Sequence, residues 1–462
     1  MEDFDVVVVG GGPAGEVAAG RCADGGLRTA LVEHELVGGE CSFWGCVPSK
    51  TLIRPGDVVA AARRVPGASA AVGGPLDLPA ALTWRDEMTN GWRDDNALPW
   101  LQEKGITLLR GTGSLAGERE VAVHSTGAAR QVRATRAVIL AVGTRPMVPP
   151  VPGLAELPPW DNRDATSAKD VPRRLLVLGG GAVGVEMAQA FRRLGSQEVV
   201  VVEGADRLMA REEPFAGEEL RIALEAEDIR VLTGTPLDRV RRKGADGPVV
   251  ATLADGLRLE TDEVLLAVGR RPATQDVGLE TVGLIPGRTV EVDDAMRAVG
   301  VPDGWLYAIG DCNGRAPLTH MGKYHGRIAA DVILGGAVRD RASASVVPRV
   351  TFTDPQICAV GLTEAQARQR GLAVRAVTYD IGAVAGAYVL GRGIAGTAKI
   401  VVDERRRTLV GATFTGPALQ ELLHSATVAI VGQVPLDTLW HAVPSFPTVS
   451  EIWLRLLETY GL

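Results

Sequence analysis

Residues 5–15 read DVVVVGGGPAG, and they are followed by EVAAGRCADGG and then by TALVE, which ends at Glu33. The valine run is typical of a strand buried on both faces of a parallel sheet. Gly10, Gly12 and Gly15 fit the pattern G-x-G-x-x-G, in which the glycines permit a tight turn, close approach of a pyrophosphate and close helix–strand packing. The N-terminus of the following helix would face the phosphates with unpaired N–H groups. The carboxylate of Glu33 would then accept hydrogen bonds from ribose hydroxyls.

The same pattern recurs in the middle of the chain. Residues 175–178 lead into GGGAVG at 179–184, then into VEMAQAFRRLG, and the strand EVVVVE ends at Glu203. Two complete fingerprints indicate two dinucleotides, one held permanently and one exchanging, which suits hydride transfer from a nicotinamide to a flavin. Glu203 would accept hydrogen bonds from NADH and repel the extra phosphate of NADPH, so NADH is favoured. Arg207 and Arg211 lie just downstream and would soften that preference.

Composition narrows the class of protein. The chain has 462 residues, 46% of them hydrophobic and 23% charged, as in soluble proteins of several domains. A net charge of -7 and 4% aromatic residues disfavour nucleic acid as a partner. No apolar run reaches the roughly 18 residues of a membrane span, and the acidic start does not resemble a signal peptide. Five cysteines are too few for a disulfide scaffold, so we expect a cytoplasmic location, where a disulfide would be catalytic.

A second short segment carries chemistry of its own. GGECSFWGCVPSK, residues 38–50, places Cys41 and Cys46 five positions apart. A structural zinc site usually needs a second Cys/His pair, and Cys22, Cys312 and Cys358 are scattered, so we expect no metal. Two inert thiols and a redox disulfide stay open from the residues alone. The place of the segment directly after a dinucleotide fingerprint favours the redox disulfide.

From end to end, the chain resembles the class I pyridine nucleotide–disulfide oxidoreductases. Residues 38–50 fit that family's redox signature, G-G-x-C-x4-C-x-P-x-K. AVGTRP (141–146) and AVGRRP (267–272) resemble its two domain crossovers, and LYAIGDCNG (306–314) carries its G-D motif. The segment that begins VPRVTFTDP at Val347 resembles the start of its dimerisation domain. The resemblance implies an α/β fold with two Rossmann-like dinucleotide-binding domains and a C-terminal α+β dimerisation domain.

The family organisation also implies domain boundaries. A discontinuous FAD-binding domain would take residues 1–148 and 272–342, an NADH-binding domain 149–271, and an interface domain 343–462. The active protein would be a homodimer with its active site at the subunit interface.

Roles for the site residues follow from the resemblance. Cys46 would be the charge-transfer thiolate against the flavin, and Cys41 the interchange thiol that attacks the acceptor. A helix N-terminus and Lys50, itself paired with Glu186, would lower the thiol pKa values. Electrons would pass from NADH to FAD, to the Cys41–Cys46 disulfide and to the acceptor. The residues expected at FAD are Gly10, Gly12, Pro13, Ala14, Gly15, Glu33, Gly39, Glu40, Cys41, Lys50, Gly113, Gly143, Asp311, Thr319 and His320. Those expected at NADH are Gly179, Gly181, Val183, Gly184, Glu203 and Gly269.

Two departures from the family lie beside the cysteines. Glu40 stands where the best-known members have threonine, which adds a carboxylate beside the flavin. Phe43 and Trp44 replace small or amide residues between the cysteines. They would either make the surroundings of the dithiol bulkier and more apolar or serve as plain packing.

The largest departure is near the C-terminus, where the family has His-Pro-T-x-S-E and this chain has FPTVSE. Phe446 takes the place of the histidine that handles the proton, which leaves Glu451 without that partner. We expect none of the following histidines to replace this base: His34, His124, His320, His424 and His441. The acceptor would then be a specialised low-molecular-weight disulfide with an acidic leaving thiol. A quinone reductase or diaphorase acting from the flavin, and a degenerate flavoprotein redox sensor, are the alternatives.

Overall fold

The computed structural model describes residues 1–244 and 247–462, and within them the chain forms two compact units. The first unit consists of residues 1–48, 85–147 and 270–344. The second consists of residues 49–84, 148–269 and 345–462. Both dinucleotide fingerprints lie at the carboxyl edge of a parallel sheet, one in each unit.

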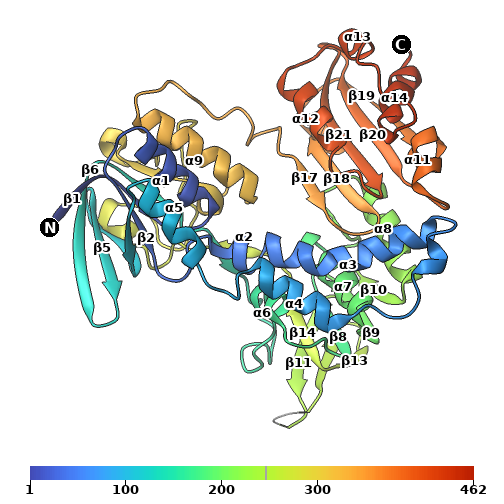
Figure 1. Ribbon diagram of the computed structural model, residues 1–462, viewed down its shortest axis with the longest axis horizontal. Coiled ribbons are helices and arrows are strands. Elements are labelled where there is room, and N and C mark those ends of the chain that lie inside the picture. The colour runs from blue at the N-terminus through green and yellow to red at the C-terminus, as the bar shows by residue number, and fades with distance from the viewer. Residues whose placement is uncertain (245–246) are drawn as a thin grey trace. The chain divides into compact units, whose positions relative to one another are not determined.

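The first unit is built on a sheet with strand order β3-β2-β1-β6-β5-β4, and β16 pairs with β6. Strands β1, β2, β3, β6 and β16 run parallel where they pair, whereas β4 and β5 are antiparallel additions. Val6, Val7 and Val8 are fully buried, as expected of a strand covered on both faces. Helices α1 and α9 pack side by side (Figure 1). The strands are β1 (Glu2–Val9), β2 (Thr29–Glu33), β3 (Thr107–Arg110), β4 (Thr112–Gly117), β5 (Glu120–Ser125), β6 (Ala128–Leu140) and β16 (Leu306–Ala308), and the helices are α1 (Pro13–Asp24), α2 (Gly39–Phe43), α5 (Leu98–Glu103) and α9 (Thr319–Ile333).

The two crossover motifs pair with each other in the first unit. β7 (Thr144–Pro146) and β15 (Arg270–Pro272) form an antiparallel ribbon, with Arg270 opposite Pro146. Two segments more than 120 residues apart in sequence are therefore held side by side. This ribbon places Thr144 and Arg270 near the G-D turn at Asp311.

The second unit repeats the parallel arrangement with strand order β10-β9-β8-β14. A small antiparallel sheet, β11-β12-β13, belongs to the same part of the chain. The strands are β8 (Arg174–Leu178), β9 (Glu198–Glu203), β10 (Ile229–Thr233), β11 (Leu237–Arg242), β12 (Val249–Leu253), β13 (Arg258–Thr261) and β14 (Glu263–Leu266), and the helices are α6 (Asn162–Ser167), α7 (Ala182–Leu194) and α8 (Pro214–Ala226). Ile53 packs in the same core as Val185 and Phe191, which explains why residues 49–84 belong to this unit. Residues 49–84 include most of α3 (Cys46–Arg64), which begins in the first unit, and the first part of α4 (Leu78–Met88).

The C-terminal part of the second unit is an antiparallel sheet with strand order β17-β18-β21-β20-β19. Helix α12 packs on β18 and β21, and α14 packs on β19 and β20 (Figure 1). The strands are β17 (Arg349–Thr351), β18 (Gln356–Gly361), β19 (Val374–Asp380), β20 (Thr397–Asp403) and β21 (Thr408–Gly416), and the helices are α10 (Glu364–Gln369), α11 (Ala385–Leu390), α12 (Leu423–Val431), α13 (Leu436–Leu439) and α14 (Ile452–Tyr460). The architecture confirms the predicted α/β fold class. The finer division into three domains stays a prediction.

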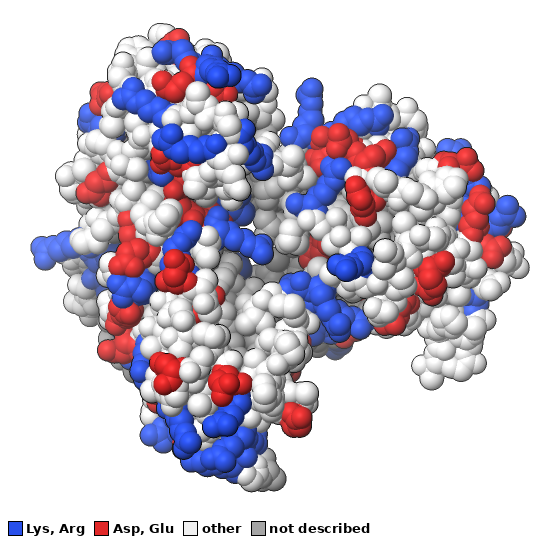
Figure 2. All heavy atoms as spheres, turned by 180° about the vertical axis from the view of Figure 1, so that it is seen from behind, with Lys and Arg blue, Asp and Glu red and all other residues white. Residues whose placement is uncertain are grey.

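The surface carries charges of both signs. On the face drawn in Figure 2, basic and acidic side chains are interspersed. Within residues 1–244 and 247–462, no helix is long and apolar enough to cross a membrane.

Candidate redox and cofactor-binding site

The first glycine turn has the shape that a pyrophosphate requires. Gly10 has a φ of +108°, and a Cβ there would lie 2.4 Å from the carbonyl oxygen of Ala141. A Cβ on Gly15 would lie 2.0 Å from the oxygen of Gly10. Beside Gly12, by contrast, a Cβ would meet nothing nearer than Gly39 Cα at 4.0 Å. The turn is thus closed against the sheet and open at the N-terminus of α1, which fits the phosphates of a dinucleotide.

The second turn repeats this geometry at Gly179, Gly181 and Gly184. A Cβ on Gly179 would lie 2.4 Å from Ala267 O, and one on Gly184 would lie 2.0 Å from Gly179 O. A Cβ on Gly181 would have no neighbour within 4 Å among the atoms of the described chain. Each unit therefore offers the same cradle for phosphate groups.

Each cradle is closed by a carboxylate at the end of the next strand. Glu33 accepts hydrogen bonds from the N–H of Gly11 (2.7 Å) and of Glu35 (2.7 Å). Burial alone would raise the pKa of Glu33, but the hydrogen bonds from His34 and these two backbone groups hold that pKa below its ordinary value. Glu203 accepts from Gly180 (2.6 Å) and from Ala205 (2.7 Å).

The exposure of the two carboxylates differs. Glu33 is buried, whereas Glu203 is half-buried. The second turn is therefore the more open of the two at its carboxylate.

The two cysteines of the redox signature lie together in the first unit. The Cys41 thiol is hydrogen-bonded to the sulfur of Cys46. Cys46 Sγ lies 3.3 Å from Thr319 Oγ1, at the start of α9. Gly38 N–H donates to Gly11 O at 2.8 Å, so the redox segment is tied directly to the first glycine turn. The arrangement brings two free thiols that contact each other to the edge of the first glycine turn.

The acidity of Cys41 differs from our expectation. We expected lowered thiol pKa values, but the pKa of Cys41 is raised, first by the hydrogen bond with Cys46 and then by burial. A thiolate at Cys41 would lie against a second sulfur in a half-buried position, which disfavours its charge. The hydrogen bond from Thr319 acts in the opposite direction and lowers that pKa.

A chain of polar contacts links Glu40 to the G-D turn. Arg270 Nη2 lies 3.4 Å from Glu40 Oε2, and its Nε donates to Thr144 Oγ1 at 2.8 Å. Thr144 Oγ1 in turn donates to Asp311 Oδ2 at 2.9 Å. Burial raises the pKa of Asp311, Thr144 and Arg270 oppose this, and Glu40 adds to it. The carboxylate of Glu40, which departs from the family signature that the sequence resembles, is therefore linked through Arg270 and Thr144 to Asp311, one of the residues expected at FAD.

Lys50 and Glu186 lie together in the second unit. Lys50 Nζ donates to Glu186 Oε2 at 2.6 Å, and the Phe352 N–H donates to Glu186 Oε1 at 2.9 Å. Lys50 Nζ also lies 4.9 Å from the centroid of the Phe352 ring. Glu186 is buried, so its charge depends on these donors. Sequence reasoning missed Phe352, because nothing in its local sequence indicates contact with Glu186 and Lys50.

The aromatic residues between the cysteines pack on each other. Phe43 is buried, and its ring lies 5.7 Å from that of Trp44. The Phe43 carbonyl accepts a hydrogen bond from Trp92 Nε1 at 3.0 Å. Sequence reasoning missed Trp92, because its segment carries no motif.

In the C-terminal segment, the side chain of Phe446 is exposed and that of Glu451 is buried. The Phe446 side chain is 76% exposed in the chain. Glu451 is buried, and it accepts hydrogen bonds from Ala385 N (3.2 Å) and Arg455 Nη2 (2.7 Å). Although Glu451 lacks the family's histidine, it has other partners within this chain.

The expectation that no histidine replaces the absent base stays a prediction. His34, His124, His320, His424 and His441 are all exposed side chains on separate elements. His325, which sequence reasoning did not consider, is fully buried in α9, where Nδ1 accepts from Gly310 N–H (3.3 Å) and Nε2 contacts Ser343 Oγ (2.8 Å). Burial lowers the pKa of His325 to about 4. It supports the G-D turn as a neutral ring.

The remaining predicted residues fall around the cradles. A Cβ on Gly113 would lie 2.8 Å from Val9 Cγ1, so this glycine serves packing under the sheet edge. Gly143 and Gly269, which precede the crossover ribbon, have φ values of +68° and +126°. Val183, in the first turn of α7, is exposed. Pro13 and Ala14 form the first turn of α1.

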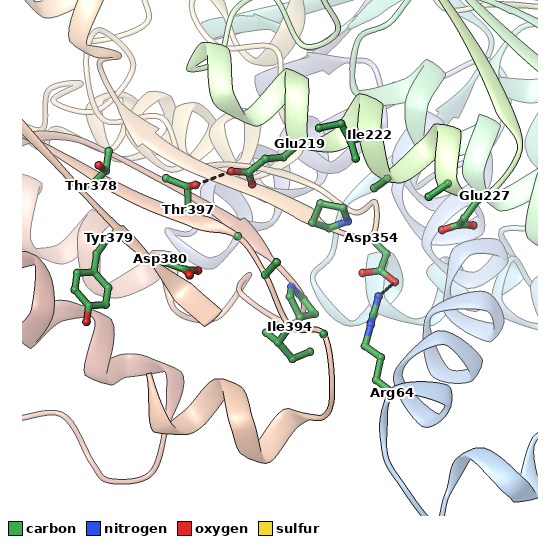
Figure 3. Close-up of a pocket in the computed structure, with 17 residues that line it drawn as sticks. Arg64, Glu219, Ile222, Glu227, Asp354, Thr378, Tyr379, Asp380, Ile394 and Thr397 are labelled. Atoms are coloured by element: carbon green, nitrogen blue, oxygen red, sulfur yellow. Dashed lines mark hydrogen bonds and ion pairs between the residues drawn. The ribbon is translucent and has the colours of Figure 1, made fainter. Parts of the chain in front are cut away.

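A cavity of about 740 Å³ lies elsewhere in the second unit, between α8 and the β19–β20 end of the C-terminal sheet (Figure 3). Ile222 lines one wall, and Glu219 accepts a hydrogen bond from Thr397 on the other. Arg64 and Asp354 form an ion pair at its edge. None of the predicted redox or cofactor residues lines this cavity. Among the described residues, no group of three or more His, Cys, Asp or Glu side chains could hold a metal ion.

Comparisons with known proteins agree with this geometry. Residues 4–326 match the pyridine nucleotide-disulphide oxidoreductase family, and residues 347–456 match its dimerisation domain. The chain is 32% identical over 457 residues to dihydrolipoyl dehydrogenase of Chlamydia muridarum (98% of this chain, 96% of that protein). It is 30% identical over 452 residues to mercuric reductase of Staphylococcus aureus (97% and 81%).

Solved structures show the same relationship. The HOCl-induced flavoprotein disulfide reductase RclA of Escherichia coli, as its Cu(II) complex, superposes with a TM-score of 0.86 at 26% identity, with 99% of each chain covered. LpdA of Mycobacterium tuberculosis gives a TM-score of 0.86 at 26% identity, with 100% of each covered. The chain therefore belongs to the pyridine nucleotide–disulphide oxidoreductases, FAD-dependent enzymes that use NAD(P)H.

Proposed function

We propose that this protein is an NADH-preferring flavoenzyme that delivers electrons to a Cys41–Cys46 disulfide and then to a specialised low-molecular-weight disulfide. The observation that carries the proposal is the contact of Cys41 with Cys46 and of Cys46 with Thr319, at the edge of the first glycine turn. FAD would supply the two-electron relay between the nicotinamide and this sulfur pair. Reduction of the disulfide takes up two electrons and two protons and gives two thiols.

The preference for NADH is supported by the charges around the second turn. Glu203 keeps a carboxylate at the end of β9, where the additional phosphate of NADPH would be repelled. The guanidinium of Arg207 donates to the carbonyls of Ala210 (2.7 Å) and Glu212 (3.1 Å). A cation already engaged with carbonyl groups is less available to a phosphate.

We propose a homodimer, in keeping with the dimerisation domain at residues 347–456. Apolar side chains of this domain are exposed in the single chain: Tyr388, Val389, Val428, Val431 and Val443. In the family, the segment that holds Phe446 completes the active site of the other subunit. The cytoplasmic location inferred from cysteine usage stays a prediction.

The proposed class of acceptor rests on how the leaving thiol would be protonated. Phe446 neither donates nor accepts a proton, and general acid–base catalysis is worth about 10²–10⁴-fold in rate. A disulfide whose leaving thiol is acidic needs little protonation to depart. Such acceptors are therefore favoured over lipoamide, whose thiols are weakly acidic.

The test is an anaerobic reduction of the purified enzyme with NADH. A thiolate–flavin charge-transfer absorption should develop, and its absence in protein with intact thiols would contradict the dithiol role. Reoxidation is then compared among lipoamide, glutathione disulfide, 5,5′-dithiobis(2-nitrobenzoate) and quinones. Because relatives include mercuric reductase and a Cu(II)-bound reductase, Hg²⁺ and Cu²⁺ are added as acceptors.

A second candidate is a quinone reductase or diaphorase that acts directly from the flavin. The raised pKa of Cys41, together with Phe446 in the place of the base, favours this alternative. Cys41→Ser should then leave NADH–quinone turnover nearly unchanged, whereas a loss above tenfold would exclude it. A degenerate redox sensor would show negligible turnover with every acceptor.

A further inference from the structure

The turn at residues 90–95 contacts the redox segment on both sides of Cys41. Asp94 Oδ2 accepts a hydrogen bond from Val37 N–H at 2.8 Å. Trp92 Nε1 donates to the carbonyl of Phe43 at 3.0 Å. These two bonds bracket residues 38–42, which hold the interchange thiol. The opposite side of the segment is tied to the first glycine turn by Gly38 and Gly11.

The backbone of the turn at residues 90–95 has positive φ values at two residues that are not glycine. Trp92 has a φ of +55°, in the left-handed region that bulky residues rarely adopt, whereas Asn90, with a φ of +49°, is of a type that adopts this region more readily. Asn90 Nδ2 donates to Arg93 O at 3.0 Å and so holds the turn. An unfavourable conformation of this kind persists only where the surroundings enforce it, and it is concentrated at functional sites.

The side chains of Trp92 and Asp94 each contact an arginine of the first unit. The Arg85 guanidinium carbon lies 5.2 Å from the centroid of the Trp92 ring, and the Arg85 side chain is fully buried. Arg110 forms an ion pair with Asp94 and donates through Nη1 to Glu35 O at 2.8 Å. The Asp94 side chain is 13% exposed. The turn therefore holds residues 37–43 through two side chains that have partners of their own, and we call it the clamp.

We propose that Trp92 and Asp94 are positioning residues that set the thiol–disulfide equilibrium of Cys41 and Cys46. The inference rests on the proposed function, because it concerns the same sulfur pair. Oxidation joins the two Sγ atoms, releases two electrons to the acceptor or to FAD, and releases two protons to solvent. A clamp that limits the freedom of residues 38–43 keeps the two sulfurs near each other in the dithiol. It therefore lowers the entropic cost of closing the disulfide.

The test uses the FAD-loaded enzyme and the variants Trp92→Phe and Asp94→Asn. Trp92→Phe keeps an aromatic ring beside Arg85 and removes the indole N–H that binds Phe43 O, together with part of the indole ring. The matched control is Trp453→Phe, which removes the bond from Trp453 Nε1 to Ser425 Oγ (2.9 Å) in the C-terminal domain. Each protein is equilibrated in dithiothreitol redox buffers, and the Cys41–Cys46 pair is trapped by alkylation and quantified by mass spectrometry.

Trp92→Phe and Asp94→Asn should each shift the equilibrium toward the dithiol by about tenfold, which is about 30 mV for a two-electron couple. FAD content should not change, and Trp453→Phe should stay within twofold of the parent protein. Equal equilibria in all four proteins would overturn the inference. Loss of FAD in both clamp variants would also overturn it, because the turn would then support the domain rather than the sulfur pair. If the parent protein itself shows no reversible couple, the proposed function fails instead.

Discussion

The carboxylate of Glu40 lies 3.4 Å from the guanidinium of Arg270, across the edge of the crossover ribbon. Both side chains are about one-third exposed (32% and 31%). The pair balances one negative against one positive charge beside Asp311, at the place where FAD is expected. In this chain, a threonine at position 40 would leave the charge of Arg270 opposed by Asp311 without Glu40.

We expect Glu40→Gln to raise the two-electron midpoint potential of FAD by about 30 mV, or tenfold in equilibrium constant. Without the carboxylate, the positive charge of Arg270 favours the addition of electrons nearby. Spectroelectrochemical titration measures the shift. Glu118→Gln, which removes an exposed partner of Arg119 in the same unit, is the control and should not move the potential. An unchanged or lower potential in Glu40→Gln would contradict the expectation.

Thr319 should control the reactivity of Cys41. Its hydrogen bonding lowers the pKa of a thiol that is otherwise raised by Cys46 and by burial. Thr319→Val should therefore raise that pKa further and slow iodoacetamide alkylation of reduced Cys41 at pH 8 by about three- to tenfold. Thr319→Ser keeps the hydroxyl and should react at the parental rate. Mass spectrometry of the alkylated peptide gives both rates, and equal rates for valine and serine would refute this role.

Phe446→His should restore a proton-transfer group where the family has one. We expect turnover with lipoamide to rise by at least tenfold, within the range of general acid–base catalysis. Phe446→Gln, which is polar but not basic, serves as the control and should give no such gain. Steady-state oxidation of NADH with each acceptor supplies the measurement. No gain from histidine would show that the absent base does not limit thiol exchange.

His325 should make the fold sensitive to mild acid. Its pKa is about 4 in the folded chain, because burial disfavours the charged ring, and about 6.5 in an unfolded chain. Above pH 6.5 the ring is neutral in both states, so its contribution to stability is complete. As the pH falls from 6.5 to 4, only the unfolded chain takes up the proton, and the free energy of unfolding drops by up to about 3 kcal/mol.

His325→Gln lacks that titration, so its urea-unfolding free energy should fall less between pH 7.5 and pH 5 than that of the parent protein. Parallel pH dependence in the two proteins would exclude His325 as the source.

Glu203 should determine nucleotide choice. Glu203→Gln removes the charge that repels the extra phosphate of NADPH, so the ratio of kcat/KM for NADH over NADPH should fall by about tenfold. Arg207→Met should leave that ratio within twofold, because the guanidinium is occupied by backbone carbonyls. A large loss of NADPH use in Arg207→Met would instead assign that cation to the phosphate.

Features that are contiguous in sequence were predictable. The strand, glycine turn, helix and acid of 5–33 follow one another within a single βαβ unit, and the structure places Glu33 on the turn. The two cysteines of residues 38–50 were likewise recognisable, because their spacing lies within one continuous segment. The prediction of lowered pKa values was wrong for Cys41, because the effect of the second sulfur and of burial depends on packing that spacing does not reveal.

Features that depend on distant segments were not predictable. Thr144 and Arg270 meet through the pairing of β7 with β15, and Trp92 reaches Phe43 from a segment with no motif. His325 lies in a helix whose sequence gives no sign that Ser343 and Gly310 will enclose its ring. Such contacts are decided by tertiary packing, which a local pattern of residues does not encode.

The matching glycine turns have a consequence for inhibition. Since Gly11 with Glu33 and Gly180 with Glu203 make the same bond, a compound that copies only the adenosine diphosphate half of a cofactor would meet the same backbone–carboxylate pair in both turns. Selectivity for the exchanging nucleotide must come from its other half. An inhibitor designed to spare the expected FAD site should therefore extend beyond the diphosphate.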